Sequence, residues 1–373
     1  MNRATWLESL RVWADDWQLG RASAWSATRF ADAQAQLLAW QMQHIPAFAA
    51  FARVRGWQPG QVDRLPYVPV TAFKSALLAA DYVPSDAPVE FHTSGTSDGQ
   101  PGRVRLLDSQ TYDASLLAGF RHFVLPETDL RIRCVSLVPD AAVRPHSSLG
   151  HMVRLLFGHV DDGHGGWFLG EQFDLPGLQR ALRRAVADDT PVLVFATSLA
   201  IQAWLDAWPA GDTLQLPRGS RLMDTGGPKG RTQLTDRAGQ HDWLVRTLGF
   251  APQLIVGEFG MTELATPRYE TTLRAHLVGD LAGVRAYAGP PWLRTVALNP
   301  ATQVPVAIGE TGMLAHVDLA NLDTPAFLLT ADLGRMLSLD NGQQALELLG
   351  RVPGSEWRGC GLDVESLLAE MAG

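Results

Sequence analysis

Apolar residues recur at intervals of three and four through the first 56 residues, as in Trp6, Leu10, Trp13 and Trp17. This spacing places the apolar side chains on one face of a helix, so we predict helices up to Gly56. Prolines at 59 and 66 then mark a loop. Two further helices are predicted, a short one within residues 69–80 and a longer one over residues 109–123.

Between about residues 130 and 265, apolar segments with strand character alternate with helical segments. The run VLVFA at residues 192–196 is continuously apolar, which is typical of a buried strand in a parallel sheet. The alternation predicts an α/β sheet covered by helices on both faces. The predicted strands are residues 131–138, 192–196, 221–225 and 254–258, and the clearest predicted helix is residues 178–187.

From about residue 270 onward, glycine- and proline-containing turns multiply and the predicted strands become shorter. This change indicates an appended β-rich subdomain. We therefore predict an α/β protein with mixed sheets. Its regions are an N-terminal helical region (1–88), an α/β core (89–270), a β-rich subdomain (271–349) and a short C-terminal tail (350–373).

The composition is that of a globular protein, with 46% hydrophobic and 19% charged residues among 373. The net charge of −8 argues against a general nucleic-acid binder. We find no apolar run long enough to span a membrane and no secretory signal at the N-terminus. Two distant cysteines, Cys134 and Cys360, suggest neither a disulfide framework nor a zinc site, so a cytoplasmic location is expected.

The segment FHTSGTSDGQPGRVR at residues 91–105 is rich in hydroxyl side chains and glycine. Glycines let backbone N–H groups approach an anion closely, hydroxyls add donors, and an arginine adds charge. The segment lacks the GKS or GKT ending of a Walker A loop. It is either a phosphate-binding loop or an ordinary surface loop. The candidate phosphate-binding residues are Thr93, Ser94, Gly95, Thr96, Ser97, Gly99 and Arg103.

The run TSGTSDGQPGR resembles the phosphate loop of the adenylate-forming superfamily, which includes acyl-CoA synthetases, adenylation domains and firefly luciferase. The usual pattern there is [ST]SGTTGxPK. The present sequence has an extra residue around Asp98, and Arg103 stands where lysine is usual. The resemblance implies that the core binds ATP and a carboxylic acid and forms an acyl-adenylate with Mg²⁺.

A second match, EFGMTE at residues 258–263, resembles the YGxTE motif of the same superfamily. The resemblance implies that Phe259 packs near the adenine, with Gly260 and Met261 beside the nucleotide. It also implies that Thr262 contacts the α-phosphate and that Glu263 holds Mg²⁺. A carboxylate is a suitable ligand for this hard cation. The alternative for Glu263 is a solvated residue at the start of a helix.

Three further segments follow the superfamily's motifs. Gly226 and Gly227, in DTGGPKG, resemble a turn whose backbone lines the adenine pocket. Asp332, in TADLG, resembles the aspartate of TGDLG, which binds the ribose hydroxyls. Arg351, in a Gly-Arg pair, resembles an arginine that contacts the nucleotide. Each segment alone could be a surface turn, but together they occur in the superfamily's order.

The end of the chain departs from the full-length superfamily pattern. Full-length members carry a mobile C-terminal domain that supplies a lysine, whereas residues 352–373 contain no lysine. We expect that domain to be absent or vestigial, with Arg103, Lys229, Arg351 or a partner supplying positive charge instead. This length and ending resemble the LuxE-type acyl-protein synthetases of the fatty-acid reductase system in luminous bacteria. The residues that carry this resemblance are Leu65-Pro66, Val68-Pro69-Val70, Phe73-Lys74, Ser148, Gly150-His151, Gly350-Arg351 and Arg358-Gly359-Cys360.

LuxE-type synthetases carry their acyl group on a cysteine near the C-terminus, which implies Cys360 here. Its glycine neighbours leave space around the sulfur, and Arg358 would favour the thiolate, the nucleophilic form. The alternative is a small buried apolar residue. Cys134 lies within a predicted strand and is expected to be structural. His151 is a candidate for acid binding, although a structural histidine is an equal alternative.

The sequence thus predicts ATP-dependent activation of a fatty or aryl acid, followed by acyl transfer to Cys360 or to a partner protein. The expected partner is an acyl acceptor such as a reductase or a carrier protein. One alternative is a free-standing ligase that forms a CoA ester or an amide. Another is a non-catalytic nucleotide-binding subunit.

Overall fold

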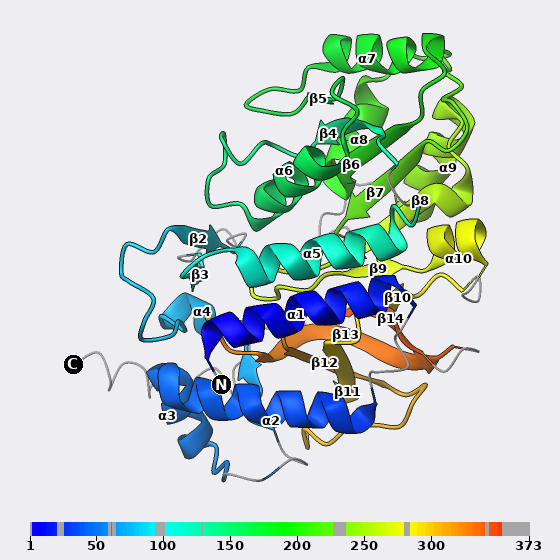
Figure 1. The fold of residues 1–373 in the computed structure, drawn as a ribbon. Coiled ribbons are helices and arrows are strands. Elements are labelled where there is room, and N and C mark those ends of the chain that lie inside the picture. Colours follow the sequence, from blue (N-terminus) through cyan, green and yellow to red (C-terminus); the bar gives the residue numbers. More distant parts are fainter. Residues whose placement is uncertain are drawn as a thin grey trace. The chain divides into compact units, whose positions relative to one another are not determined.

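In the computed structural model the chain forms two compact units, each built from segments that alternate along the sequence (Figure 1). Unit 1 comprises Met1–Gly119, Met261–Pro267 and Ala288–Gly373, and unit 2 comprises Phe120–Gly260 and Arg268–Tyr287. The four-region division along the sequence stays a prediction. The structure describes residues 2–20, 26–58, 61, 65–93, 101–127, 130–226, 236–279, 284–339 and 343–352.

The first residues of unit 1 form the predicted helices α1 (Arg3–Gln18), α2 (Ala27–His44) and α3 (Pro46–Val54). The side chains of Asn2 and Ser26 cap α1 and α2 by accepting hydrogen bonds from backbone N–H groups. The four apolar positions of α1 that predicted the helix are all buried. The helical prediction for this region is therefore confirmed.

The short helix predicted within residues 69–80 is confirmed as α4 (Ala72–Ser75). The preceding strand β1 (Val68–Pro69) pairs with a strand far along the chain. A β-hairpin of β2 (Val89–His92) and β3 (Arg103–Leu106) follows, and then helix α5 (Gln110–Phe123). The helix predicted over residues 109–123 is thus confirmed.

The strands of unit 1 after residue 288 are long rather than short, so that expectation is wrong. They are β11 (Leu293–Leu298), β12 (Thr311–Asp318), β13 (Phe327–Ser338) and β14 (Gln344–Arg351). They pair antiparallel in this order, and β1 joins β13 in parallel. Pairing between antiparallel neighbours stabilises these long strands, and the glycines and prolines lie largely in the connections between them.

Unit 2 contains a mostly parallel sheet in the order β5-β4-β6-β7-β8, with β9 antiparallel to β8. Each of the four predicted strands overlaps a strand of this sheet and the predicted helix lies within α7, so the α/β prediction is confirmed. The strands are β4 (Arg133–Leu137), β5 (Gly166–Trp167), β6 (Val192–Thr197), β7 (Arg221–Thr225), β8 (Ile255–Phe259) and β9 (Arg268–Glu270). The short strand β10 (Tyr287–Ala288) contains the last residue of unit 2 and the first residue of the final segment of unit 1. The helices are α6 (Ser148–Val160), α7 (Leu175–Ala187), α8 (Ser198–Ala207), α9 (Arg237–Leu248), the 3₁₀ helix η2 (Pro252–Leu254) and α10 (Thr272–Val278).

The sheet of unit 2 buries apolar side chains on both faces. Alternate residues of β6, such as Val194, pack with α7, α8 and α9 in one core cluster. Phe195 points the other way, and its ring lies 6.1 Å from that of Phe120 and 6.5 Å from that of Phe157 on α6. This two-sided burial explains why β6 is continuously apolar in sequence. Among the described residues, no helix is both long and apolar enough to cross a membrane.

Candidate nucleotide-binding site

The base of the predicted phosphate loop is fixed by a pair of hydrogen bonds at the end of the β2–β3 hairpin. The backbone N–H of Thr93 donates to the carbonyl of Gly102, and the N–H of Gly102 donates to Oγ1 of Thr93, both at 2.9 Å. A side chain at Gly102 would lie about 3.1–3.2 Å from Thr93 and the backbone of Phe73, so glycine fits this position best. The loop predictions for Ser94, Gly95, Thr96, Ser97 and Gly99 lie outside the described residues.

Two arginines on β3 have different surroundings. Arg105 donates through Nε to Glu90 at 2.5 Å, and Nε2 of His92 lies 2.7 Å from the same carboxylate. The hydrogen bond from His92 and the charge of Arg105 hold the pKa of Glu90 below its ordinary value. Arg103, two residues earlier on the same strand, is exposed. Arg103 is therefore the more exposed of the two arginines of β3.

The predicted magnesium ligand Glu263 lies in a turn within the segment Met261–Pro267 of unit 1. Only 8% of Glu263 is exposed, so the alternative of a solvated residue at a helix start is wrong. The backbone around it is held by Asn321, which donates to the Glu263 carbonyl at 2.8 Å and accepts from the Ala265 N–H at 2.8 Å. Thr262 and Glu263 thus sit on a fixed piece of backbone. No sequence motif pointed to Asn321, because it lies 58 positions away from Glu263.

Two of the residues predicted near the adenine, Gly226 and Phe259, lie at the carboxyl ends of neighbouring parallel strands of unit 2. Thr225 of β7 pairs with Glu258 of β8, so Gly226 and Phe259 follow at the same edge of the sheet. Ligands of open α/β sheets bind at this carboxyl edge. Gly226 has φ +86°, a conformation that favours glycine, and its carbonyl accepts a hydrogen bond from Ser198 Oγ. Gly227 lies outside the described residues.

A buried charge network supports this edge, and sequence reasoning missed it. Arg237, at the start of α9, donates to Asp224 at 3.0 Å and to both oxygens of Glu270 at 2.7 and 3.1 Å. Arg285 and the Gly257 N–H also donate to Glu270, at 2.6 and 2.7 Å. Both carboxylate side chains are 1% exposed. Nothing in the sequence links these four charged side chains, which come from separate elements.

The predicted ribose and nucleotide contacts of unit 1 meet on one hairpin. Asp332 and Arg351 are cross-strand partners on β13 and β14, and Nε of Arg351 lies 3.0 Å from Oδ1 of Asp332. Arg351 is exposed, whereas the side chain of Asp332 is only 16% exposed. The structure therefore brings together two residues that the sequence suggested separately.

Two predicted catalytic residues have different outcomes. His151 lies in the first turn of α6, after the N-cap Ser147, and is half-buried. Cys360 lies outside the described residues. The other cysteine, Cys134, is fully buried in β4, and its sulfur donates to the Ile132 carbonyl at 3.5 Å. Burial, with Asp161 and Asp162 nearby, raises the pKa of this thiol, so Cys134 is structural as expected.

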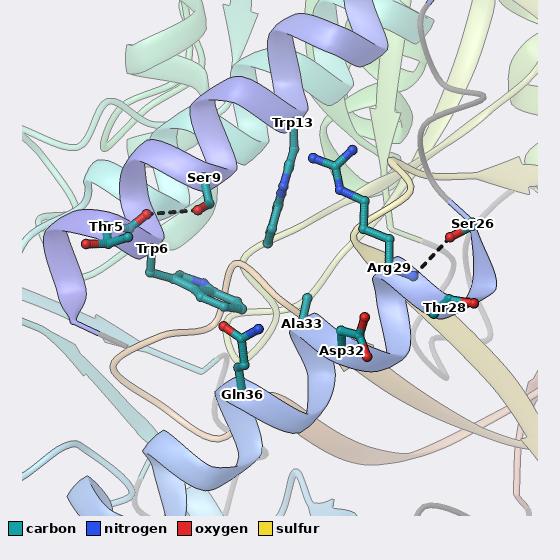
Figure 2. Close-up of a pocket in the computed structure, with 10 residues that line it drawn as sticks. All are labelled: Thr5, Trp6, Ser9, Trp13, Ser26, Thr28, Arg29, Asp32, Ala33 and Gln36. Atoms are coloured by element: carbon teal, nitrogen blue, oxygen red, sulfur yellow. Dashed lines mark hydrogen bonds between the residues drawn. The ribbon is translucent and has the colours of Figure 1, made fainter.

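A cavity of about 440 Å³ lies between α1 and α2 (Figure 2). Figure 2 shows Trp6 and Trp13 projecting from α1 toward α2, where Ala33 and Gln36 lie opposite them. The remaining lining residues are Thr5, Ser9, Ser26, Thr28, Arg29 and Asp32. None of the residues that line it belongs to the predicted nucleotide site.

A family model described as an acyl-protein synthetase, LuxE, matches residues 183–369, half of the chain. The chain belongs to this family. The long-chain-fatty-acid–luciferin-component ligase of Vibrio harveyi is 28% identical over 158 residues, which cover 41% of this chain and 39% of that protein. The ligase of the same name from Aliivibrio fischeri is 31% identical over 83 residues, 21% of this chain and 22% of that protein. The matches thus span about two fifths or less of the relatives' length.

Solved structures share the fold of this LuxE family member. The open conformation of 2-hydroxyisobutyryl-CoA ligase, in complex with 2-HIB-AMP and CoA, has a TM-score of 0.61 at 15% identity, covering 87% of this chain and 69% of that one. The thioesterification state of the same ligase has a TM-score of 0.60, covering 88% and 68%. At this identity the likeness concerns the fold alone. The predicted mixed α/β fold is therefore confirmed.

Proposed function

We propose that this protein uses ATP to activate a carboxylic acid as an acyl-adenylate and then transfers the acyl group to a thiol. The acid's carboxylate would attack the α-phosphate of ATP and release pyrophosphate. A thiolate would then attack the acyl carbonyl and release AMP, leaving a thioester. The family relatives named as long-chain-fatty-acid ligases support a fatty acid as the substrate class.

The observation that carries the proposal is the pairing of Asp332 with Arg351. A carboxylate accepts hydrogen bonds from both hydroxyls of a ribose, and an arginine beside it balances phosphate charge. Because Arg351 is mostly exposed, its ion pair with Asp332 contributes little stability and can exchange for nucleotide contacts. The pair lies in unit 1 with Glu263 and the β2–β3 hairpin.

The residues of the Met261–Pro267 segment fit a role in holding Mg²⁺. Glu263 provides a carboxylate, the ligand type that Mg²⁺ prefers, on backbone that Asn321 fixes. When bound, Mg²⁺ would neutralise charge on the triphosphate. Thr262 would donate a hydrogen bond to the α-phosphate, and Arg103 would add charge near the outer phosphates.

We propose Cys360 or a partner protein's thiol as the acyl acceptor. The only other cysteine of the chain, Cys134, is buried with its thiol pKa raised, so it is a poor nucleophile. An acyl-accepting reductase or carrier protein would take the group onward. His151, exposed in part on α6, is proposed to assist acid binding.

The test is ATP–pyrophosphate exchange with a panel of fatty and aryl acids, followed by incubation with a labelled acid. We expect exchange with one or more acids and label bound to the protein through a thioester. Cys360→Ser should remove the bound label without abolishing exchange, and the matched control Cys134→Ala should keep both.

The outcomes separate the alternatives. Exchange together with persistent label in Cys360→Ser would rule out that cysteine as the acceptor. Exchange with label passing only to CoA or an amine would favour a free-standing ligase. ATP binding without exchange for any acid would overturn the proposal in favour of a nucleotide-binding subunit.

A further inference from the structure

The connection between β12 and β13, residues 319–326, is buried throughout, although connections usually run over the surface. Buried backbone polar groups need hydrogen-bond partners, so a buried connection requires side chains that supply them. Asp318 precedes this connection at the end of β12, and Asn321 and Asp323 lie within it. Their exposed fractions are at most 4%.

On one side, the connection holds the segment that carries Thr262 and Glu263. Asn321 donates to the Glu263 carbonyl and accepts from Ala265, as described above, and also donates to the Pro325 carbonyl at 3.0 Å. Oδ2 and Oδ1 of Asp318 accept from the Thr266 N–H at 2.8 Å and the Thr266 hydroxyl at 2.7 Å. The backbone is therefore held immediately after the predicted magnesium ligand.

On the other side, the connection is held by α2. The side chain of Gln41 is fully buried, and its Nε2 donates to the carbonyls of Asn321 and Thr324, both at 2.7 Å. Its Oε1 accepts from the Ala326 N–H at 2.9 Å. Counting a longer bond of 3.4 Å to the Leu322 carbonyl, one glutamine thus bonds four backbone groups of the connection and fixes the residue that holds Glu263.

A second set of hydrogen bonds links the connection to α1. Arg3 donates to both oxygens of Asp323, at 3.2 and 3.3 Å, and the Tyr82 hydroxyl donates to Oδ1 at 2.8 Å. The Leu107 N–H, just after β3, donates to Oδ2 at 2.9 Å. The N-terminal helices and the β2–β3 hairpin are therefore linked through the connection to the Glu263 segment, all within unit 1.

We infer that Asn321, held in place by Gln41, is a positioning residue that sets the backbone of Thr262 and Glu263 for binding the magnesium complex of ATP. The inference rests on the proposed function for the identity of the ligand. Misplacing a binding group by about 1 Å can cost about a hundredfold in rate. Loss of the hydrogen bonds from Asn321 should therefore weaken ligand binding, although Asn321 itself need not contact the ligand. The N-terminal helices α1 and α2 would therefore support the proposed Mg²⁺–ATP site in addition to packing in unit 1.

The experiment measures ATP affinity by calorimetry, with and without Mg²⁺ and without acid, in wild type, Asn321→Ala and Gln41→Met. We expect Asn321→Ala to weaken Mg²⁺–ATP binding about tenfold and to change ATP binding without Mg²⁺ little. Gln41→Met keeps the bonds between Asn321 and the Glu263 segment, so a smaller change in the same direction is expected. This second variant serves if Asn321→Ala fails to fold.

The matched control is Thr295→Val, which removes one buried hydrogen bond of 2.7 Å between Thr295 and His316 on neighbouring strands of the same unit. It should lower the unfolding temperature without changing the benefit that Mg²⁺ gives to ATP binding. If Mg²⁺ increases ATP affinity by the same factor in the Thr295 control and in the Asn321 and Gln41 variants, the inference is overturned. Wild-type binding of Mg²⁺–ATP without pyrophosphate exchange would overturn the proposed function alone, and no wild-type binding would overturn both.

Discussion

Asp332 and Arg351 face each other across β13 and β14, joined by an ion pair of 3.0 Å. The same hairpin carries a second cross-strand ion pair, between Arg335 and Glu347. The two pairs share strands, spacing and chemistry, but only the first contains residues that match nucleotide-binding motifs. Substitutions in the Asp332–Arg351 pair therefore test nucleotide binding, and substitutions in the Arg335–Glu347 pair provide the control.

Asp332→Asn should weaken ATP binding about tenfold or more, because the proposed charge-assisted acceptor for the ribose hydroxyls is lost. Wild type should prefer ATP over 2′-deoxy-ATP, and the variant should lose most of this preference. Calorimetric titration of both nucleotides measures the effect. Glu347→Gln is the control and should leave both affinities unchanged; an equal loss in the control would refute the ribose role.

Arg103→Ala should raise the ATP concentration for half-maximal exchange by about tenfold, because an exposed cation beside the proposed phosphate loop is removed. Arg103→Lys should retain most of the activity, since it restores the residue usual in the superfamily. Arg105→Lys is the comparison on the same strand. Its effect should be on stability through Glu90 rather than on ATP. If Arg103→Ala leaves ATP dependence unchanged, this arginine has no part in phosphate binding.

The pH dependence of stability should contain a contribution from Asp318. Burial raises the pKa of this carboxyl from 3.8 to about 6, despite the hydrogen bonds from Thr266 and Ala320 that act in the opposite direction. The folded state then holds the proton more tightly than the unfolded chain. This contribution to stability is fully present below about pH 4 and is lost as the pH rises to about 6.

Asp318→Asn removes this titration. Relative to the variant, wild type should lose about 2–3 kcal/mol of unfolding free energy between about pH 4 and pH 7. Urea unfolding of both proteins over that range measures the difference. A difference that stays constant with pH would show that Asp318 titrates normally.

Arg237→Met should destabilise the protein by about 3–5 kcal/mol, because it leaves the carboxylates of Asp224 and Glu270 buried without their shared cation. Arg285→Met removes another partner of Glu270, but this arginine is 38% exposed. Its loss should cost about 1 kcal/mol. Chemical unfolding ranks the two, and the reverse order would contradict the assigned network.

Cys134 should resist alkylation in the folded protein and react rapidly after unfolding. In a Cys360→Ser background it is the only cysteine, so mass spectrometry after iodoacetamide treatment reports on it alone. The expected ratio of rates is about a hundredfold or more, because the thiol is fully buried and its pKa is raised. Fast modification under native conditions would reopen Cys134 as an acyl acceptor.

The sequence predicted the elements whose burial is visible in local periodicity. The apolar stripe of α1 and the continuous run of β6 needed no knowledge of distant residues. The length of β13 could not be predicted in this way, because its stability comes from pairing with β1, β12 and β14. The glycines and prolines between those strands suggested short strands, whereas in the structure they lie largely in the connections between long strands.

The candidate site shows the same limit. Motif resemblance suggested Asp332 and Arg351, and the structure placed them in contact. No motif pointed to Gln41 or Asn321, because each acts through hydrogen bonds to backbone groups far away in the sequence. Such bonds depend on the position of a side chain in the fold, which local pattern does not reveal.

The seven residues of Met261–Pro267 belong to unit 1, although the chain on either side belongs to unit 2. No single cut in the gene can therefore separate the two units intact. A fragment that ends before residue 261 would lack Thr262 and Glu263, and a fragment that begins there would lack α1 and α2. Two-piece complementation and circular permutation should succeed only at breakpoints that leave Met261–Pro267 covalently joined to the unit 2 segments before and after it.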